Sequence, residues 1–166
     1  ARHGVRLLGS AEACLRGSAL RTEEFTSTRD LHARMERWCR RHPHGVVVHS
    51  AAVGDYEARA LPGKIPSGQP SITVTLTPTA KILDLIRDWA PDTFLVSFKA
   101  ADPATTTEAL EGIARAQLAR TRSNLVFANV LGQTQTDVLL VGPTGRTRYA
   151  RREDAVTALI ERIERL

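Results

Sequence analysis

The sequence has few cysteines, few aromatic residues and no long hydrophobic run. Its 166 residues include two cysteines, Cys14 and Cys39, and aromatic side chains make up 5% of the chain. Two cysteines are too few for a disulfide framework, so we expect a protein of the reducing cytoplasm. No run of about 18 apolar residues occurs, and the first residues lack the pattern of a secretory leader. We therefore expect no membrane partner.

Lysine is also scarce, although the chain is basic. The 23 basic residues outnumber the 18 acidic ones, which gives a net charge of +5 and favours an anionic partner. Nucleic-acid binding usually needs a dense basic stripe with interleaved aromatic residues, whereas here the arginines are spread along the chain. We therefore expect no nucleic-acid partner. Three of the basic residues are lysines, Lys64, Lys81 and Lys99.

Short apolar runs alternate with segments of helical period. Apolar stripes at helical spacing run through residues 31–39, 82–89, 110–118 and 156–163. The apolar runs that read as buried strands are residues 5–8, 46–49, 94–98, 125–128 and 138–141. This alternation predicts βαβ units and an α/β fold, a Rossmann-like three-layer sandwich around a mainly parallel sheet.

Two segments predict a small antiparallel extension of that fold. Residues 71–77 alternate strictly, with Ile72, Val74 and Leu76 on one face and threonines on the other, which is typical of a half-exposed strand. The preceding residues, 62–70, are rich in glycine and proline and should form a mobile loop. A second hairpin is expected around the turn at residues 142–145.

The chain lacks the opening that a doubly wound domain normally has. Neither GxGxxG nor GxxxxGK[ST] occurs, so no glycine-rich turn leads from a first strand into a phosphate-binding helix. The first ten residues, ARHGVRLLGS, read instead as the end of a helix followed by the second strand. We expect a single domain over residues 1–166 without the opening unit.

Candidate site residues follow the ends of predicted strands, where open α/β sheets bind ligands. Ala51 and Ala52 would let a ligand approach the backbone, and Asp55 can accept hydrogen bonds from it; the alternative is a plain turn. Lys64 lies in the mobile loop, where its ammonium could neutralise the charge that develops on a phosphate in a transition state; the alternative is a solvated loop lysine.

Two further strand ends supply side chains that suit a nucleotide. Asn129 could read a base or ribose, or cap a turn, and Phe98 could stack on a base or fill the core. His42 and His44 have no partner at metal-ligand spacing, so we expect an exposed turn and no metal site, and we expect His49 to be a hydrogen-bonded core residue.

The segments SAAVGDY, LTPTAKIL, FLVSFKA and ARAQLARTRSNLVFANVLG, in this order, resemble the phosphopantothenoylcysteine synthetase family. The resemblance extends from about Gly4 to the last predicted helix. These ligases, partners of the coenzyme A flavoprotein decarboxylases, join 4′-phosphopantothenate to cysteine through an acyl nucleotide made from CTP or ATP with Mg²⁺.

The resemblance also implies roles for the candidate residues. Ala51, Ala52 and Asp55 would hold phosphopantothenate, Phe98 and Asn129 would bind the nucleotide, and Lys64 would be the catalytic lysine of a flap. A homodimer built partly from the exposed strand is expected as well, and a phosphopantothenoylcysteine decarboxylase as a further partner.

The sequence departs from the family's pattern at several places. The glycine-rich nucleotide-binding opening is absent, Ala101 stands where an acidic residue is usual, although Asp102 is adjacent, and Arg151 and Arg152 replace a lysine ahead of the last helix. The alternative to a ligase is therefore a non-catalytic homologue that binds phosphopantothenate or nucleotide as a regulatory or dimerising module.

Overall fold

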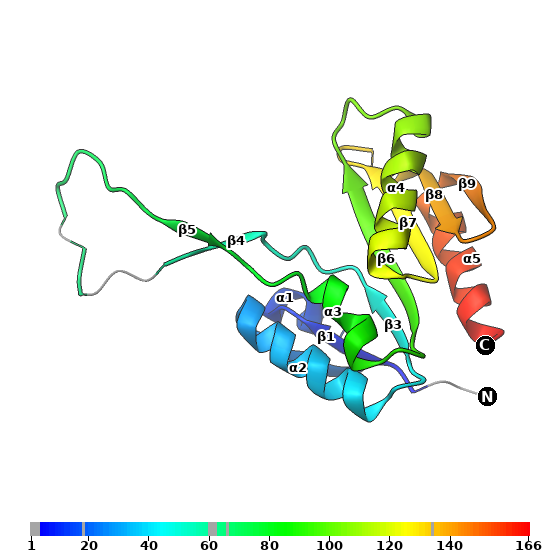
Figure 1. Ribbon diagram of the computed structural model, residues 1–166, viewed down its shortest axis with the longest axis horizontal. Coiled ribbons are helices and arrows are strands. Elements are labelled where there is room, and N and C mark those ends of the chain that lie inside the picture. Colours follow the sequence, from blue (N-terminus) through cyan, green and yellow to red (C-terminus); the bar gives the residue numbers. More distant parts are fainter. Residues whose placement is uncertain (1–3, 18, 60–62, 66, 134) are drawn as a thin grey trace.

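The centre of the molecule is a mixed β-sheet. The computed structural model describes residues 4–17, 19–59, 63–65, 67–133 and 135–166 (Figure 1). Within these residues, three parallel strands are followed by an antiparallel hairpin. In sheet order the strands are β3 (Val46–His49), β6 (Phe94–Ala101), β7 (Leu125–Val130), β8 (Thr136–Gly142) and β9 (Gly145–Arg151). The predicted strands 46–49, 94–98, 125–128 and 138–141 and the second hairpin are confirmed.

Helices cover both faces of this sheet. On β7, Val126 and Ala128 pack against α4 (Thr107–Thr121), while Leu125 and Phe127 point to the opposite face and pack against α5 (Arg152–Glu164). Two more helices, α2 (Thr28–Arg41) and α3 (Ile82–Trp89), pack on Val47 and Leu95, which lie on the α4 side. The predicted three-layer α/β sandwich is confirmed.

A separate pair of parallel strands precedes α2. β1 (Arg6–Gly9) and β2 (Arg21–Glu24) pair with each other on either side of α1 (Ala11–Arg16), and no pairing joins them to β3 in the described part of the chain. The expectation that the chain opens on a helix end is not supported, because residues 4 and 5 are not helical and residues 1–3 lie outside the described range.

A long arm, residues 56–78, extends away from the body (Figure 1). At its base β4 (Tyr56–Ala58) pairs antiparallel with β5 (Leu76–Pro78). The prediction of a strand over 71–77 is wrong for 71–75, because in the described residues the pairing of the two limbs ends with the hydrogen bond that the Arg59 N–H donates to the Thr75 carbonyl at 3.0 Å. Residues 60–62 and 66 of the arm lie outside the described residues.

Two of the helices begin at residues whose side chains cap them. Ser27 caps α2 by accepting a hydrogen bond from the Asp30 N–H, and Thr106 caps α4 in the same way. No helix in the described residues is long and apolar enough to cross a membrane.

Candidate functional site

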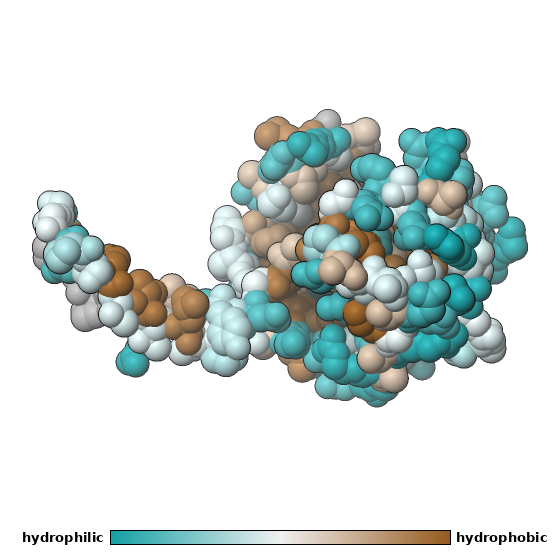
Figure 2. All heavy atoms as spheres, turned by 90° about the horizontal axis from the view of Figure 1, so that it is seen from above, coloured by the Kyte–Doolittle hydropathy of each residue, from teal (hydrophilic) through white to brown (hydrophobic). Residues whose placement is uncertain are grey.

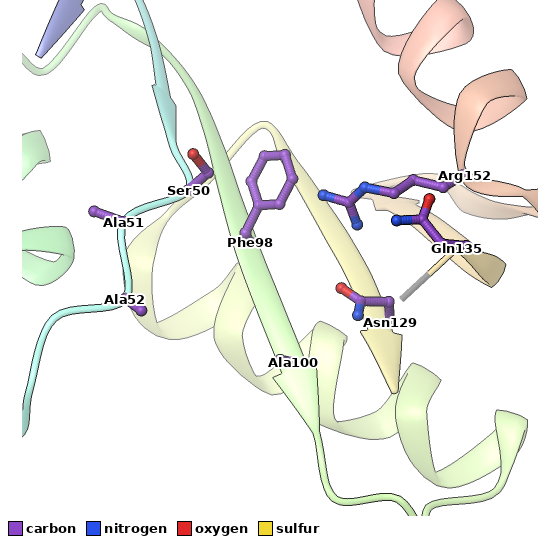
Figure 3. A pocket seen from close by; sticks show the side chains of 8 residues that line it. All are labelled: Ser50, Ala51, Ala52, Phe98, Ala100, Asn129, Gln135 and Arg152. Carbon is purple, nitrogen blue, oxygen red and sulfur yellow. The ribbon is translucent and has the colours of Figure 1, made fainter. Parts of the chain in front are cut away.

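A pocket of about 520 Å³ opens at the carboxyl ends of the parallel strands (Figure 3). It lies on the α5 side of the sheet, because Phe98, Ala100 and Asn129 alternate with the residues that face α4. Its walls come from the segment after β3, from β6 and β7, from the residue preceding β8 and from the first residue of α5. The lining residues are Ser50, Ala51, Ala52, Phe98, Ala100, Asn129, Gln135 and Arg152.

Four of the residues selected from the sequence meet in this pocket. Ala51 and Ala52 form one wall, and Phe98 and Asn129 come from the two neighbouring strands (Figure 3). The alanines are exposed and present no long side chain, so a ligand can approach the backbone at this edge of the sheet. Two of the three residues implied for phosphopantothenate therefore share one cavity with both residues implied for the nucleotide.

Phe98 packs in the core and also reaches the pocket. Its ring stacks on the fully buried ring of Phe127, with centroids 4.6 Å apart and planes inclined by 15°. Phe98 itself is half-buried and lines the pocket. One side of the ring therefore belongs to the core and the rest is available to a ligand.

Asn129 is almost entirely buried, with 5% of its surface exposed, yet it reaches the pocket. Its amide nitrogen donates a hydrogen bond of 3.3 Å to the Val130 carbonyl. The side chain thus has a fixed orientation at the end of β7, and an amide presents both donor and acceptor atoms to a ligand.

Asp55 does not line the pocket. Its carboxylate is exposed and lies 3.7 Å from the ammonium of Lys81, immediately before α3. Thr79 fixes this segment, because its hydroxyl donates to the Gly54 carbonyl at 2.5 Å and its N–H donates to the Asp55 carbonyl at 2.9 Å. Asp55 follows the pocket wall along the chain, and its side chain pairs with Lys81.

Lys64 does not line the pocket either. It is exposed and belongs to the arm, which points away from the body in Figure 1. Gly63 and Gly68, on either side of it, have φ angles of 83° and 87°, a conformation that glycine adopts readily and other residues rarely do. Contact between Lys64 and a ligand in the pocket requires a different position of the arm.

Sequence reasoning missed four of the lining residues, Ser50, Ala100, Gln135 and Arg152. The Arg152 guanidinium carbon lies 4.9 Å from the centroid of the Phe127 ring, and the Arg152 N–H donates to the Gln135 carbonyl at 2.9 Å. The only sequence signal was the pair of arginines ahead of the last helix. Nothing in the sequence indicated which of the two would face the pocket.

The histidine predictions have mixed outcomes. His42 and His44 are exposed, as expected for a surface turn. His49 is half-buried and burial lowers its pKa, but its Nε2 has no hydrogen-bond partner in the described residues, so the expectation of a hydrogen-bonded histidine is wrong for that atom. In the described part of the chain no three His, Cys, Asp or Glu side chains come together as a metal site would require.

Comparison with known sequences points to one family. The family profile of the DNA/pantothenate metabolism flavoprotein C-terminal domain matches residues 4–165. The coenzyme A biosynthesis bifunctional protein CoaBC of Thermococcus kodakarensis is 43% identical over 101 residues, 58% of this chain and 25% of that protein. Human phosphopantothenate–cysteine ligase is 30% identical over 129 residues, 75% of this chain and 40% of that protein. The chain thus spans less than half the length of either relative.

Solved structures agree with the fold. The crystal structure of the DNA/pantothenate metabolism flavoprotein from Streptococcus pneumoniae has a TM-score of 0.76 at 27% identity, covering 87% of this chain and 72% of that one. The C-terminal domain of a coenzyme A biosynthesis bifunctional protein CoaBC has a TM-score of 0.67 at 18% identity, covering 97% and 73%. At that identity the likeness shows the fold alone.

Proposed function

The chain belongs to the DNA/pantothenate metabolism flavoprotein C-terminal domain family, and on that premise we propose that it is a phosphopantothenate–cysteine ligase of coenzyme A biosynthesis. One observation carries the proposal: Ala51 and Ala52 share a single pocket with Phe98 and Asn129. A reaction between two bound substrates needs both of them at one place in fixed orientation, and a common pocket meets that need.

The proposed reaction has two steps. The carboxylate of 4′-phosphopantothenate attacks the α-phosphorus of CTP or ATP, pyrophosphate leaves, and an acyl nucleotide forms. The amine of cysteine then attacks the acyl carbon, the nucleoside monophosphate leaves and the amide forms. The alanine wall admits phosphopantothenate, Phe98 stacks on the base, and the Asn129 amide bonds to the nucleotide. Mg²⁺ is expected to bind chiefly through the phosphates of the nucleotide, as is usual for this ion.

We propose that Lys64 acts when the arm closes over the pocket. A cation that arrives only on closure stabilises the charge developing at phosphorus more than the bound ground state. Lys64→Ala should then slow acyl-nucleotide formation about 100-fold, or roughly 3 kcal/mol, with phosphopantothenate affinity unchanged. The measurement is single-turnover formation of the intermediate without cysteine. Gln69→Ala, an exposed position of the same arm, is the control. If Lys64→Ala forms the intermediate at the wild-type rate, Lys64 is a solvated lysine with no catalytic role.

The apolar face of the arm supports a homodimer. Ile65, Ile72, Val74 and Leu76 are between 44% and 59% exposed, and Figure 2 shows apolar side chains gathered along the arm. An exposed apolar stripe of this kind commonly marks an interface. Sedimentation equilibrium at micromolar concentrations should give twice the mass of the chain. A monomer at every concentration would contradict the homodimer.

The activity assay combines 4′-phosphopantothenate, cysteine and Mg²⁺ with either CTP or ATP, and detects the amide product by mass spectrometry. Asn129→Ala should lower the yield with the preferred nucleotide. The assay is run on this chain and on a version extended with the glycine-rich opening of a relative, because that segment is absent from these 166 residues. Binding without product in both proteins would favour the non-catalytic homologue.

Two wider expectations belong to the same proposal. A phosphopantothenoylcysteine decarboxylase would consume the product, and the relative from Thermococcus kodakarensis is described as bifunctional. We place the reaction in the cytoplasm. Both expectations can be checked in the source cells by co-purification and by fractionation.

A further inference from the structure

The buried positions of α4 are apolar in its first half and polar toward its end, where they are Gln117 and Thr121. Two serines are buried beside them, Ser97 of β6 and Ser123 of the turn before β7. All four residues are between 0% and 7% exposed. A polar cluster is therefore enclosed between α4 and the sheet, on the face opposite to the pocket.

Hydrogen bonds connect the members of this cluster. The Ser123 hydroxyl lies 3.0 Å from the Ser97 hydroxyl and 2.6 Å from the Thr121 hydroxyl. The Gln117 amide nitrogen donates to the Ser97 hydroxyl at 3.0 Å and to the Phe98 carbonyl at 3.1 Å. A carbonyl oxygen only accepts, so the amide must present its nitrogen to Phe98. Gln117 thus joins the cluster to the backbone of a residue that lines the pocket.

Phe98 lies where β6 loses one of its two neighbouring strands. β3 ends at His49, opposite Ser97, whereas β6 continues beside β7. The Gln117 amide supplies a hydrogen bond at the end of this paired segment. The Phe98 ring points to the other face, where it stacks on Phe127 with centroids 4.6 Å apart and lines the pocket. The residue is therefore held by its backbone from the α4 side and by its ring on the α5 side.

Stability alone does not account for a polar cluster at this place. Burying an amide or a hydroxyl costs free energy that its hydrogen bonds roughly regain, and apolar groups of the same shape can replace such a pair at almost no cost. A fully bonded network adds a single geometry, since its hydrogen bonds form only within narrow ranges of distance and angle. The cluster therefore fixes the part of β6 that carries Phe98.

We infer that Gln117 is a positioning residue that acts through Phe98. Its amide holds the Phe98 backbone so that the ring faces the pocket at one angle. Stacking of a nucleotide base depends on the angle between the two ring planes, so a rotated ring should bind the nucleotide less tightly. The part of the inference that concerns the nucleotide rests on the proposed ligase function, whereas the placement of the ring by Gln117 does not.

The position of the ring is measured first, in the ligand-free protein, by NMR with ¹³C-labelled phenylalanine, of which the chain has four. Gln117→Met keeps the length of the side chain but cannot donate, and it should shift the Phe98 ring signals, which are assigned by their loss in Phe98→Leu. Ser123→Ala is the matched control, because Ser123 belongs to the same buried cluster but its hydroxyl bonds to Ser97 and Thr121. It should leave the Phe98 signals in place.

Nucleotide affinity is measured second, by calorimetry with CTP and with ATP. Gln117→Met should weaken the nucleotide that the wild type binds roughly three- to tenfold, the loss expected for one neutral hydrogen bond. Affinity for 4′-phosphopantothenate should stay within about twofold, because Ala51 and Ala52 belong to the segment after β3. In a Phe98→Ala background the Gln117 change should have no further effect, since the two residues act as a unit.

Three results would overturn the inference. The Phe98 signals could stay unmoved in Gln117→Met, they could shift equally in Ser123→Ala, or the loss of nucleotide affinity could persist in full in the Phe98→Ala background. Circular dichroism and melting temperature report whether each variant folds. If Gln117→Met does not fold, Gln117→Asn, one methylene too short to reach both acceptors, is measured in its place with the same expectations.

The two measurements separate the inference from the proposed function. If the Phe98 signals shift only in the Gln117 variant but the wild type binds neither nucleotide, the positioning role stands and the ligase proposal fails. If the wild type binds a nucleotide and the Phe98 signals do not move, the ligase proposal stands and the positioning role fails.

Discussion

Replacing Arg87 with methionine should destabilise the protein more than any exposed arginine replacement would. Near the end of α3, its guanidinium donates to the carbonyls of Pro91, Thr93 and Arg122 at 2.6, 2.7 and 2.8 Å, and to the side-chain oxygen of Asn124 at 2.6 Å. These acceptors belong to the loop before β6 and to the turn between α4 and β7. One side chain therefore joins three segments at the amino edge of the sheet.

The expected loss of stability depends on which of these hydrogen bonds are shielded from water. The bonds to Thr93 and Asn124 are partly buried, whereas water can replace the other two. A hydrogen bond to a charged group contributes about 1.5–3 kcal/mol, so two of them amount to about 3–4 kcal/mol at the lower end of that range. The lower end applies because burial, followed by the charge of Arg122, lowers the pKa of Arg87, which means that dehydration already offsets part of the gain.

Urea unfolding measures this loss of stability. The unfolding is monitored by far-ultraviolet circular dichroism and by the fluorescence of the buried Trp89 on the same helix. For a chain of this size, 3–4 kcal/mol corresponds to a fall in melting temperature of roughly 6–16 °C. Arg120→Met is the control, because Arg120 is 45% exposed and its pair with Asp84 should contribute less than about 1 kcal/mol. A loss of under about 1 kcal/mol in Arg87→Met would refute the reasoning, since water would then replace all four bonds.

Two further predictions concern buried titratable groups. Burial lowers the pKa of His49 from 6.5, so the unfolded state takes up the proton more readily and stability should fall as the pH drops below about 6.5. His49→Phe should flatten that slope in denaturant titrations between about pH 7 and 5, and an unchanged slope would point to another group. Burial raises the pKa of Cys39 to about 11, so iodoacetamide should modify Cys14 first in the native protein and both cysteines alike in urea. Equal rates of modification of the two cysteines in the native protein would show that the core around α2 opens readily.

The strands and helices of the core could be predicted from the sequence because their signals are local. Runs such as residues 125–130 bury every side chain, and the stripe through residues 82–89 covers one helix face, so periodicity alone identifies them. β2 carries no such signal, since its sequence is Arg-Thr-Glu-Glu and it forms a strand only because β1 lies beside it. Residues 71–75 show the converse, because they carry a strand pattern but lie outside β5.

The candidate site also combines features that the sequence predicted with features that only the tertiary structure decided. That Ala51, Phe98 and Asn129 come from neighbouring strands or the segment after one follows from the order of the apolar runs, because the carboxyl ends of parallel strands share one edge of the sheet. Only the tertiary structure decided that Arg152, from the start of the last helix, would complete the pocket, because that depends on how the β8–β9 hairpin returns the chain to the same face. Tertiary packing also directed Asp55 toward Lys81 and carried Lys64 outward on the arm. No local periodicity records such distances between remote segments, since they arise only when the sheet and its covering helices have packed together.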